Sequence, residues 1–116
     1  MDNLFKSLAD ENRLRIINLL IREELCVCEI EAILDTTQSN ISRHLTRLRN
    51  EEIVVFEKKS QWIYYHINPK FIEDNDLLYK YLIEKMGLNN KFKGDLKKLS
   101  LYKEKGMSCE NIKEIK

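Results

Sequence analysis

Residues 24–50, ELCVCEIEAILDTTQSNISRHLTRLRN, decide the fold of this chain. Apolar side chains recur in it at helical spacing on two stretches, namely Val27, Ile30, Ile33 and Leu34, then Ile41, Leu45 and Leu48. Between them lie Asp35, Thr36 and Thr37, and a threonine hydroxyl there can cap the free N–H groups of a helix start. The stretch therefore predicts two short helices, over residues 27–34 and 38–50, joined by a tight polar turn.

The second of these helices has a polar face that suits a DNA groove. Gln38 lies in its first turn, and Ser39, Ser42, Arg43 and Thr46 share one side. Short hydroxyl and amide groups reach base edges or phosphates, and arginine pairs with guanine or clamps a phosphate. The alternative is an ordinary solvated helix face. The cap, the short turn and the hairpin that follows favour a DNA-reading helix-turn-helix.

A β-hairpin is predicted directly after the second helix. Its strands cover Ile53–Lys58 and Gln61–Ile67, with a turn at Lys59 and Ser60, because β-branched and aromatic residues dominate both runs. Two strands after a helix-turn-helix form a wing. Lys58, Lys59 and Gln61 at its tip are placed to contact phosphate or the minor groove, although lysines at a turn also serve solubility alone.

Helices are predicted on both sides of this centre. Residues 3–8 form a short helix, Asp10 caps a helix over residues 11–22, and Asn68 caps a helix over residues 70–86. The late helix is rich in apolar residues, so we expect it to dimerise with the first helix, giving a two-fold protein for a palindromic operator. The alternative is that it packs only on its own core.

The predicted fold is therefore mainly α with a small β-hairpin wing. Residues 1–87 form the winged helix-turn-helix DNA-binding and dimerisation domain. Residues 88–116 form a basic C-terminal extension that carries Cys109, with a further helix expected over residues 95–105; the extension holds eight lysines and four acidic residues.

Composition narrows the function. The chain has 116 residues, which suits one domain, and its net charge is only +1. No apolar run is long enough to span a bilayer and the N-terminus lacks a signal-peptide pattern, so we expect a cytoplasmic protein without membrane contact. With three glycines, no phosphate loop and no nucleophile–base pair, the sequence does not indicate an enzyme.

Cys26 and Cys28 form a thiol pair beside the reading helix. In a regular helix their side chains would point about 200° apart, so both sulfurs meet one ion only if the first turn is irregular or becomes so on binding. Binding would then distort the platform of the reading helix. Sulfur ligands favour thiophilic ions over magnesium or calcium. The alternatives are a pair of small buried hydrophobes and a redox sensor that oxidises, also with Cys109.

The order of elements and the motif ELCVCEIEAIL…TTQSNISRHLTRLRNEEIV resemble the ArsR/SmtB family of metal-responsive repressors over about residues 3–86. The resemblance is closest to the arsenical-resistance repressors. It implies a homodimer that binds double-stranded operator DNA and leaves it when arsenite or antimonite binds Cys26 and Cys28. The DNA-contacting positions of the family fall here on Gln38, Ser39, Ser42, Arg43 and His44, and we count Arg47 with them; for His44 the alternative is a packed or solvated side chain.

The sequence also departs from this family pattern. Where many arsenical repressors have a third cysteine, this chain has Glu31, so Cys109, from the same chain or across the dimer, is the candidate third ligand. A cadmium/lead-responsive repressor fits less well, since no cysteine precedes Cys26. The expected function is a repressor that needs no cofactor and has arsenite or antimonite as its inducer. The alternatives are a thiol-based redox-sensing winged-helix regulator, a cadmium/lead-responsive repressor and a winged helix that docks protein.

Overall fold

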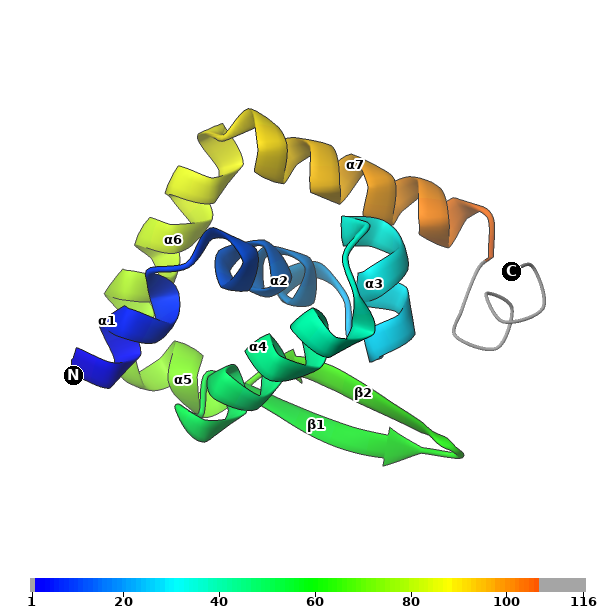
Figure 1. Ribbon diagram of the computed structural model, residues 1–116. Coiled ribbons are helices and arrows are strands. Elements are labelled where there is room, and N and C mark those ends of the chain that lie inside the picture. The colour runs from blue at the N-terminus through cyan, green and yellow to red at the C-terminus, as the bar shows by residue number, and fades with distance from the viewer. Residues whose placement is uncertain (1, 107–116) are drawn as a thin grey trace.

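The computed structural model describes residues 2–106, which form helices around a small antiparallel hairpin (Figure 1). In chain order the elements are α1 (Asp2–Leu8), α2 (Glu11–Arg22), α3 (Val27–Leu34), α4 (Gln38–Asn50), β1 (Val54–Lys59), β2 (Trp62–Ile67), α5 (Pro69–Asp74), α6 (Asp76–Leu88) and α7 (Asn90–Glu104). This is a winged helix-turn-helix, as the sequence predicts.

Side-chain caps set the starts of the central helices. The Asp10 carboxylate accepts the backbone N–H of Arg13 at 3.1 Å, and the Thr37 hydroxyl accepts that of Asn40 at 3.2 Å. Each cap satisfies a donor that has no partner inside its helix. The predicted bounds of α2, α3 and α4 are confirmed.

The wing is a hairpin with a two-residue turn. Lys59 pairs with Trp62, so the turn consists of Ser60 and Gln61, and Ser60 has a left-handed backbone with φ of 60°. The prediction of a turn at Lys59 and Ser60 was wrong by one residue. Leu25, just before the cysteines, adds a single bridge to Tyr65 of β2 through two backbone hydrogen bonds of 3.1 and 2.8 Å.

The late helices differ from the prediction of one helix over residues 70–86. Asn75 breaks it into α5 and α6, with φ of −129° and its carboxamide donating to the Phe71 carbonyl. α6 runs to Leu88, two residues beyond the predicted end. α7 begins at Asn90, five residues before the predicted start, because the Asn89 side chain accepts from the N–H groups of Lys91 and Phe92.

The core is apolar and lies between α2, α3, α4 and the base of the wing. Its fully buried members are Ile16, Ile17, Leu19, Leu25, Ile30, Ile41, Leu45, Leu48, Ile53 and Val54. α7 lies across α2 and reaches α3 at its far end (Figure 1). Among residues 2–106, no helix has the length and hydrophobicity that crossing a membrane requires.

Candidate functional site

The outer face of α4 is polar and accessible. Gln38, Ser39, Arg43 and Thr46 are exposed, and Ser42 is half-buried. The Arg43 guanidinium donates to the Asn40 side chain at 3.2 Å, and the Thr46 hydroxyl donates to the Ser42 carbonyl at 2.8 Å. These bonds are within one or two turns of α4, so they orient the side chains while leaving the face open.

His44 is not part of this face. It is only 6% exposed, and its Nδ1 lies 3.4 Å from Nη1 of Arg13 on α2. Burial lowers the pKa of His44, and the charges of Arg13 and Arg43 lower it further against the opposing effect of Asp10. An arginine can only donate, so the imidazole is neutral here. Its burial favours the packed alternative for His44, in which the imidazole lies between α4 and α2, over a contact with DNA.

Arg47 remains exposed but is already held by the first helix. Its Nε donates to the hydroxyl of the buried Ser7 at 3.1 Å. Arg13 donates to the carbonyls of Ser7 and Lys6 at 2.7 and 3.2 Å. The end of α1 is therefore tied directly to α4.

The tip of the wing carries the three predicted polar residues, Lys58, Lys59 and Gln61, all of them exposed. Lys59 also forms an ion pair with Glu24, and this carboxylate is the first cause of the raised pKa of Lys59. The wing tip thus contacts the segment that leads into the cysteines.

The two cysteines meet at the start of α3. Cys26 is the N-cap residue and has an extended backbone (φ −92°, ψ 169°), while Cys28 lies in the first helical turn. Their Sγ atoms are 3.2 Å apart. The sequence analysis required an irregular first turn for both sulfurs to meet one ion, and the structure shows one: Cys26 caps the helix, and helical spacing applies only from Val27. Cys26 is buried, and Cys28 is half-buried.

This spacing fits a thiophilic ion. Two sulfurs at about 2.3 Å from one centre, with an angle between 90° and 110°, lie about 3.3–3.8 Å apart. The pair therefore needs little movement to act as two ligands. Within residues 2–106, no group of three or more His, Cys, Asp or Glu side chains could hold a metal ion. The predicted third ligand, Cys109, lies outside the described residues.

A buried carboxylate accepts a hydrogen bond from the backbone of the cysteine pair. Glu29 is 1% exposed; its Oε1 accepts the backbone N–H of Cys26 at 3.0 Å, and its Oε2 accepts the hydroxyl of Tyr102 on α7 at 3.0 Å. Lys103 lies 3.8 Å from Oε2. Burial, together with the charge of Glu29, raises the pKa of Tyr102, so the phenol stays protonated and donates.

Sequence reasoning missed Glu29, Tyr102 and the Leu25 bridge. A glutamate three residues after a helix cap is a known capping pattern, and it could have indicated the role of Glu29. The contact between Glu29 and Tyr102 spans 73 residues, and no local pattern indicates it.

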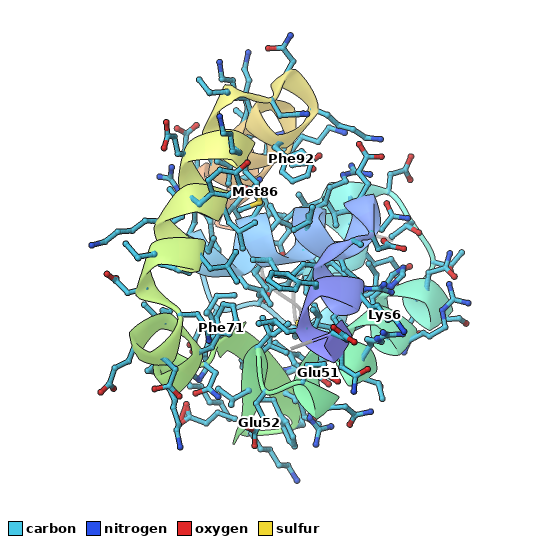
Figure 2. All side chains as sticks on the ribbon, turned by 90° about the vertical axis from the view of Figure 1, so that its left-hand side faces the viewer. Lys6, Glu51, Glu52, Phe71, Met86 and Phe92 are labelled. Carbon is cyan, nitrogen blue, oxygen red and sulfur yellow. The ribbon has the colours of Figure 1, made fainter. Side chains whose placement is uncertain are left out.

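A separate apolar surface lies on α6 and α1, the side that faces the viewer in Figure 2. Leu77, Tyr81 and Leu88 form one stripe of α6 and are 83%, 54% and 68% exposed, and Phe5 of α1 is 51% exposed. Phe71 and Met86, labelled in the same view, are buried instead. Exposed apolar side chains along one stripe of a helix are typical of an association surface.

The comparisons with known proteins agree with this geometry. The pattern described as "Bacterial regulatory protein, arsR family" matches residues 10–55. The arsenic resistance transcriptional regulator ArsR1 of Pseudomonas putida is 42% identical over 82 residues, which is 70% of this chain and 64% of that protein. The arsenical resistance operon repressor of Bacillus subtilis is 40% identical over 79 residues, 67% of this chain and 73% of that one.

Two further matches are a cadmium resistance regulator and a regulator of known structure. The cadmium resistance regulator CadC of Listeria innocua is 41% identical over 68 residues, 58% of this chain and 57% of that protein. The crystal structure of the regulator HlyU from Vibrio vulnificus superimposes with a TM-score of 0.57 at 35% identity, over 68% of this chain and 83% of that one.

Each of these proteins is named as a regulator or a repressor, and none as an enzyme. The chain spans about three fifths of the length of several curated relatives, 64%, 60% and 57% in three of them. The identity to the Bacillus protein extends over most of that protein, and the helix-turn-helix carries the family pattern. This chain belongs to the arsR family of bacterial regulatory proteins.

Proposed function

We propose that this chain is a homodimeric transcriptional repressor that binds double-stranded operator DNA and releases it when trivalent arsenic or antimony binds Cys26 and Cys28. The observation that carries the inducer assignment is the 3.2 Å contact between the two sulfurs at the start of α3. Soft sulfur ligands at that spacing suit a thiophilic ion.

The DNA surface consists of the outer face of α4 and the wing tip. Gln38, Ser39, Ser42 and Arg43 would enter the major groove, with Arg43 on a guanine or a phosphate. Arg47, Lys58, Lys59 and Gln61 would contact the backbone. The proposal is supported by the exposure of these groups, Ser42 being half-buried, on two adjacent elements of a winged helix.

Dimerisation would bury the apolar stripe on α6 together with Phe5 of α1. A two-fold axis through this surface would present two copies of α4 to successive major grooves of a palindromic site. The dimer interface would then be linked to the DNA surface through α1, because the Ser7 hydroxyl of α1 accepts a hydrogen bond from Arg47 of α4.

The inducer signal would pass through the segment that holds the cysteines. Leu25, one residue before Cys26, shares two backbone hydrogen bonds with Tyr65 of the wing, and Glu24 pairs with Lys59 at its tip. Binding of an ion replaces a sulfur–sulfur contact with a new ligand geometry, and recruitment of Cys109 as a third ligand would pull on the same segment. The wing and α4 would then lose their positions on DNA.

The test is a fluorescence anisotropy titration with operator DNA selected from a random duplex library. Arsenite should release the wild-type protein. Cys26→Ser and Cys28→Ser should bind DNA equally well without responding to arsenite, and Cys109→Ser should respond at higher concentration. If DNA stays bound to the reduced wild-type protein in saturating arsenite, the inducer assignment is wrong.

A redox sensor is the second candidate, because the same 3.2 Å sulfur contact would let the pair oxidise to a disulfide with peroxide as the electron acceptor. Peroxide without metalloid would then release DNA, and dithiothreitol would restore binding. The third candidate is a cadmium-responsive repressor. Adding cadmium in place of arsenite in the same titration tests it: release of DNA by cadmium and not by arsenite would favour this candidate.

A further inference from the structure

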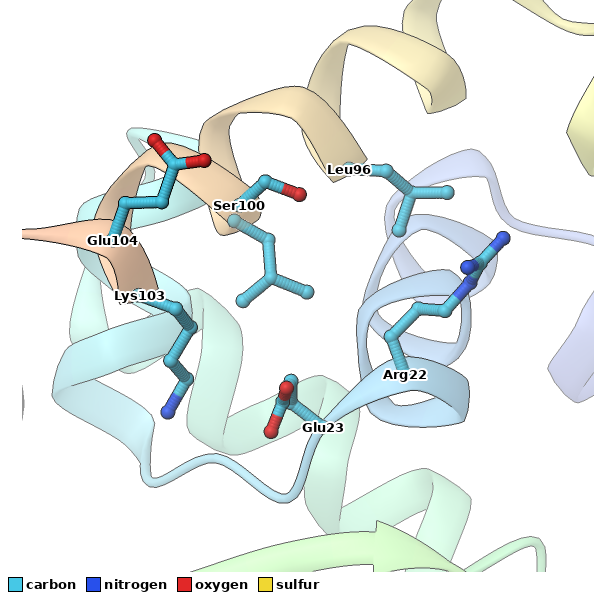
Figure 3. Close-up of a pocket in the computed structure, with 7 residues that line it drawn as sticks. Arg22, Glu23, Leu96, Ser100, Lys103 and Glu104 are labelled. Atoms are coloured by element: carbon cyan, nitrogen blue, oxygen red, sulfur yellow. The ribbon is translucent and has the colours of Figure 1, made fainter.

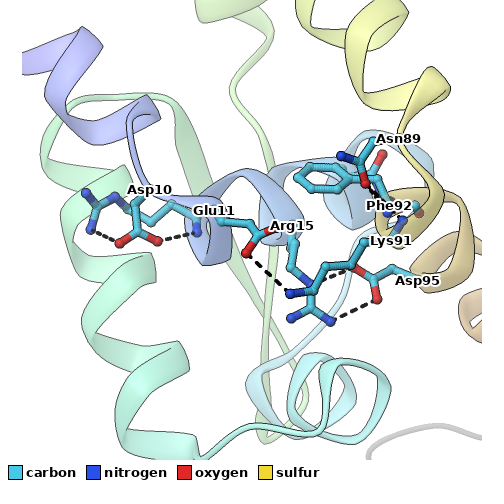
Figure 4. A network of polar contacts seen from close by, with 9 residues as sticks. Asp10, Glu11, Arg15, Asn89, Lys91, Phe92 and Asp95 are labelled. Carbon is cyan, nitrogen blue, oxygen red and sulfur yellow. Dashed lines mark hydrogen bonds and ion pairs between the residues drawn. The ribbon is translucent and has the colours of Figure 1, made fainter.

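Helix α7 is anchored at its N-terminal half to α2. Arg15 donates to both carboxylate oxygens of Asp95 at 2.7 and 2.9 Å (Figure 4). Asn18 donates to the Phe92 carbonyl at 3.1 Å. Asp95 is 3% exposed, so this end of α7 is held by buried polar contacts. These contacts fix where the helix starts and leave the placement of its last turns to other residues.

The C-terminal half of α7 stands away from α2. A pocket of about 570 Å³ lies between them, with Arg22 and Glu23 on one wall and Leu96, Ser100 and Glu104 on the other (Figure 3). The last turns of α7 therefore gain little support from α2. They are held instead by the buried Leu99 and by the hydrogen bond from Tyr102 to Glu29 on α3.

The carboxylate that receives this hydrogen bond is the one that holds Cys26. Oε1 of Glu29 accepts the Cys26 N–H and Oε2 accepts the Tyr102 hydroxyl, both at 3.0 Å. Both oxygens are thus fixed, and the carboxylate plane is set by α3 and α7 together. A side chain fixed at both oxygens places the backbone of Cys26, and with it the direction of its sulfur.

We propose that Tyr102 is a positioning residue for the thiol site: through Glu29 it holds Cys26 in the orientation that brings its sulfur to that of Cys28. This inference rests on the proposed function, in which the two cysteines bind the inducer. In this role α7 keeps the two cysteines in the geometry that binds a thiophilic ion while no ion is bound. Preorganisation of this kind lowers the ordering cost of binding.

The test compares Tyr102→Phe with Leu99→Val. Tyr102→Phe removes the hydroxyl and keeps the ring, whereas Leu99→Val loosens the packing of the same end of α7 without touching Glu29. Arsenite affinity of the 116-residue protein is measured by the thiolate–arsenic absorbance. Amide hydrogen exchange at Cys26 is measured by NMR in the arsenite-free protein.

Tyr102→Phe should weaken the arsenite Kd about fivefold to tenfold, which converts to about 1–1.4 kcal/mol and matches the loss of one hydrogen bond. It should also speed exchange of the Cys26 amide severalfold. Leu99→Val should lower the melting temperature without either effect.

Equal arsenite affinity and equal Cys26 exchange in the two variants would overturn the positioning role and leave the proposed function standing. A wild-type protein that does not bind arsenite would refute the proposed function itself. The two failures are therefore distinguishable in one set of measurements.

Discussion

The buried ion pair between Arg15 and Asp95 gives a quantitative test of how α7 is attached. The substitution is Asp95→Asn, which keeps the shape of the side chain and removes its charge. The Arg15 side chain is 13% exposed and the Asp95 side chain 4%, and two short hydrogen bonds join them. Asp95 also raises the pKa of Arg15, mainly through these bonds. The guanidinium remains charged after the substitution because an arginine side chain in a protein is effectively always protonated.

The expected loss of unfolding free energy depends on the contacts that Arg15 keeps after the substitution. Removing one partner of a fully buried pair costs about 3–5 kcal/mol because the other charge is left unpaired. Asparagine keeps one acceptor oxygen and Arg15 keeps some contact with water, so the expected loss is about 2–3 kcal/mol. This is a large share of the roughly 5–15 kcal/mol that stabilises a domain.

Urea unfolding at fixed protein concentration measures this loss. With an m-value of about 1.5 kcal/mol per molar urea, the midpoint should fall by about 1.3–2 M. Glu11→Gln is the matched control, since the Glu11–Lys91 pair joins the same two helices but has side chains 57% and 50% exposed (Figure 4). Its loss should stay below about 0.5 kcal/mol. The reasoning is refuted if Asp95→Asn and Glu11→Gln shift the midpoint equally.

Three other outcomes are expected. Burial lowers the pKa of His44, so as pH drops through about 6.5 the unfolded chain takes up a proton on this residue before the folded chain does, and the free energy of unfolding should fall. His44→Gln should remove that slope in urea titrations from about pH 7.5 to 5.5. Leu77→Glu places a charge in the exposed stripe of α6 and should give monomers in analytical ultracentrifugation, whereas Lys80→Glu, at an exposed position in an i,i+4 ion pair, should stay dimeric. Arg43→Ala should reduce the slope of log K against log salt for DNA binding by about one, and Arg22→Ala, beside the α7 pocket, should leave it unchanged.

The elements that local chemistry sets were predictable from the sequence. Asp10 and Thr37 cap their helices through their own side chains, so the starts of α2 and α4 follow from residue type and position. The break at Asn75 did not follow, because the apolar spacing continues across it while the backbone turns there. The start of α7 depends on the Asn89 cap, which lies outside the apolar pattern used to predict that helix.

The candidate site also has features that the sequence predicts and features that depend on the fold. The cysteine pair and the polar face of α4 were evident as residue types at a given spacing. The angle between Cys26 and Cys28 was not, since it depends on whether Cys26 lies inside the helix or caps it. His44 lies three residues after Ile41 and four before Leu48, which already placed it near the inward side of α4. Its burial against Arg13 depends on how α2 crosses α4.

The bridge between Leu25 and Tyr65 lies at a distance from the tip of the wing. The turn at Ser60 lies five residues beyond Tyr65, which is about 17 Å along an extended strand. A rotation of about 5° at the bridge would therefore swing the tip by about 1.5 Å, half the length of a hydrogen bond. In the proposed function, a small rotation of the segment beside Cys26 on ion binding would therefore be amplified at the wing tip, where the residues proposed to contact phosphate lie.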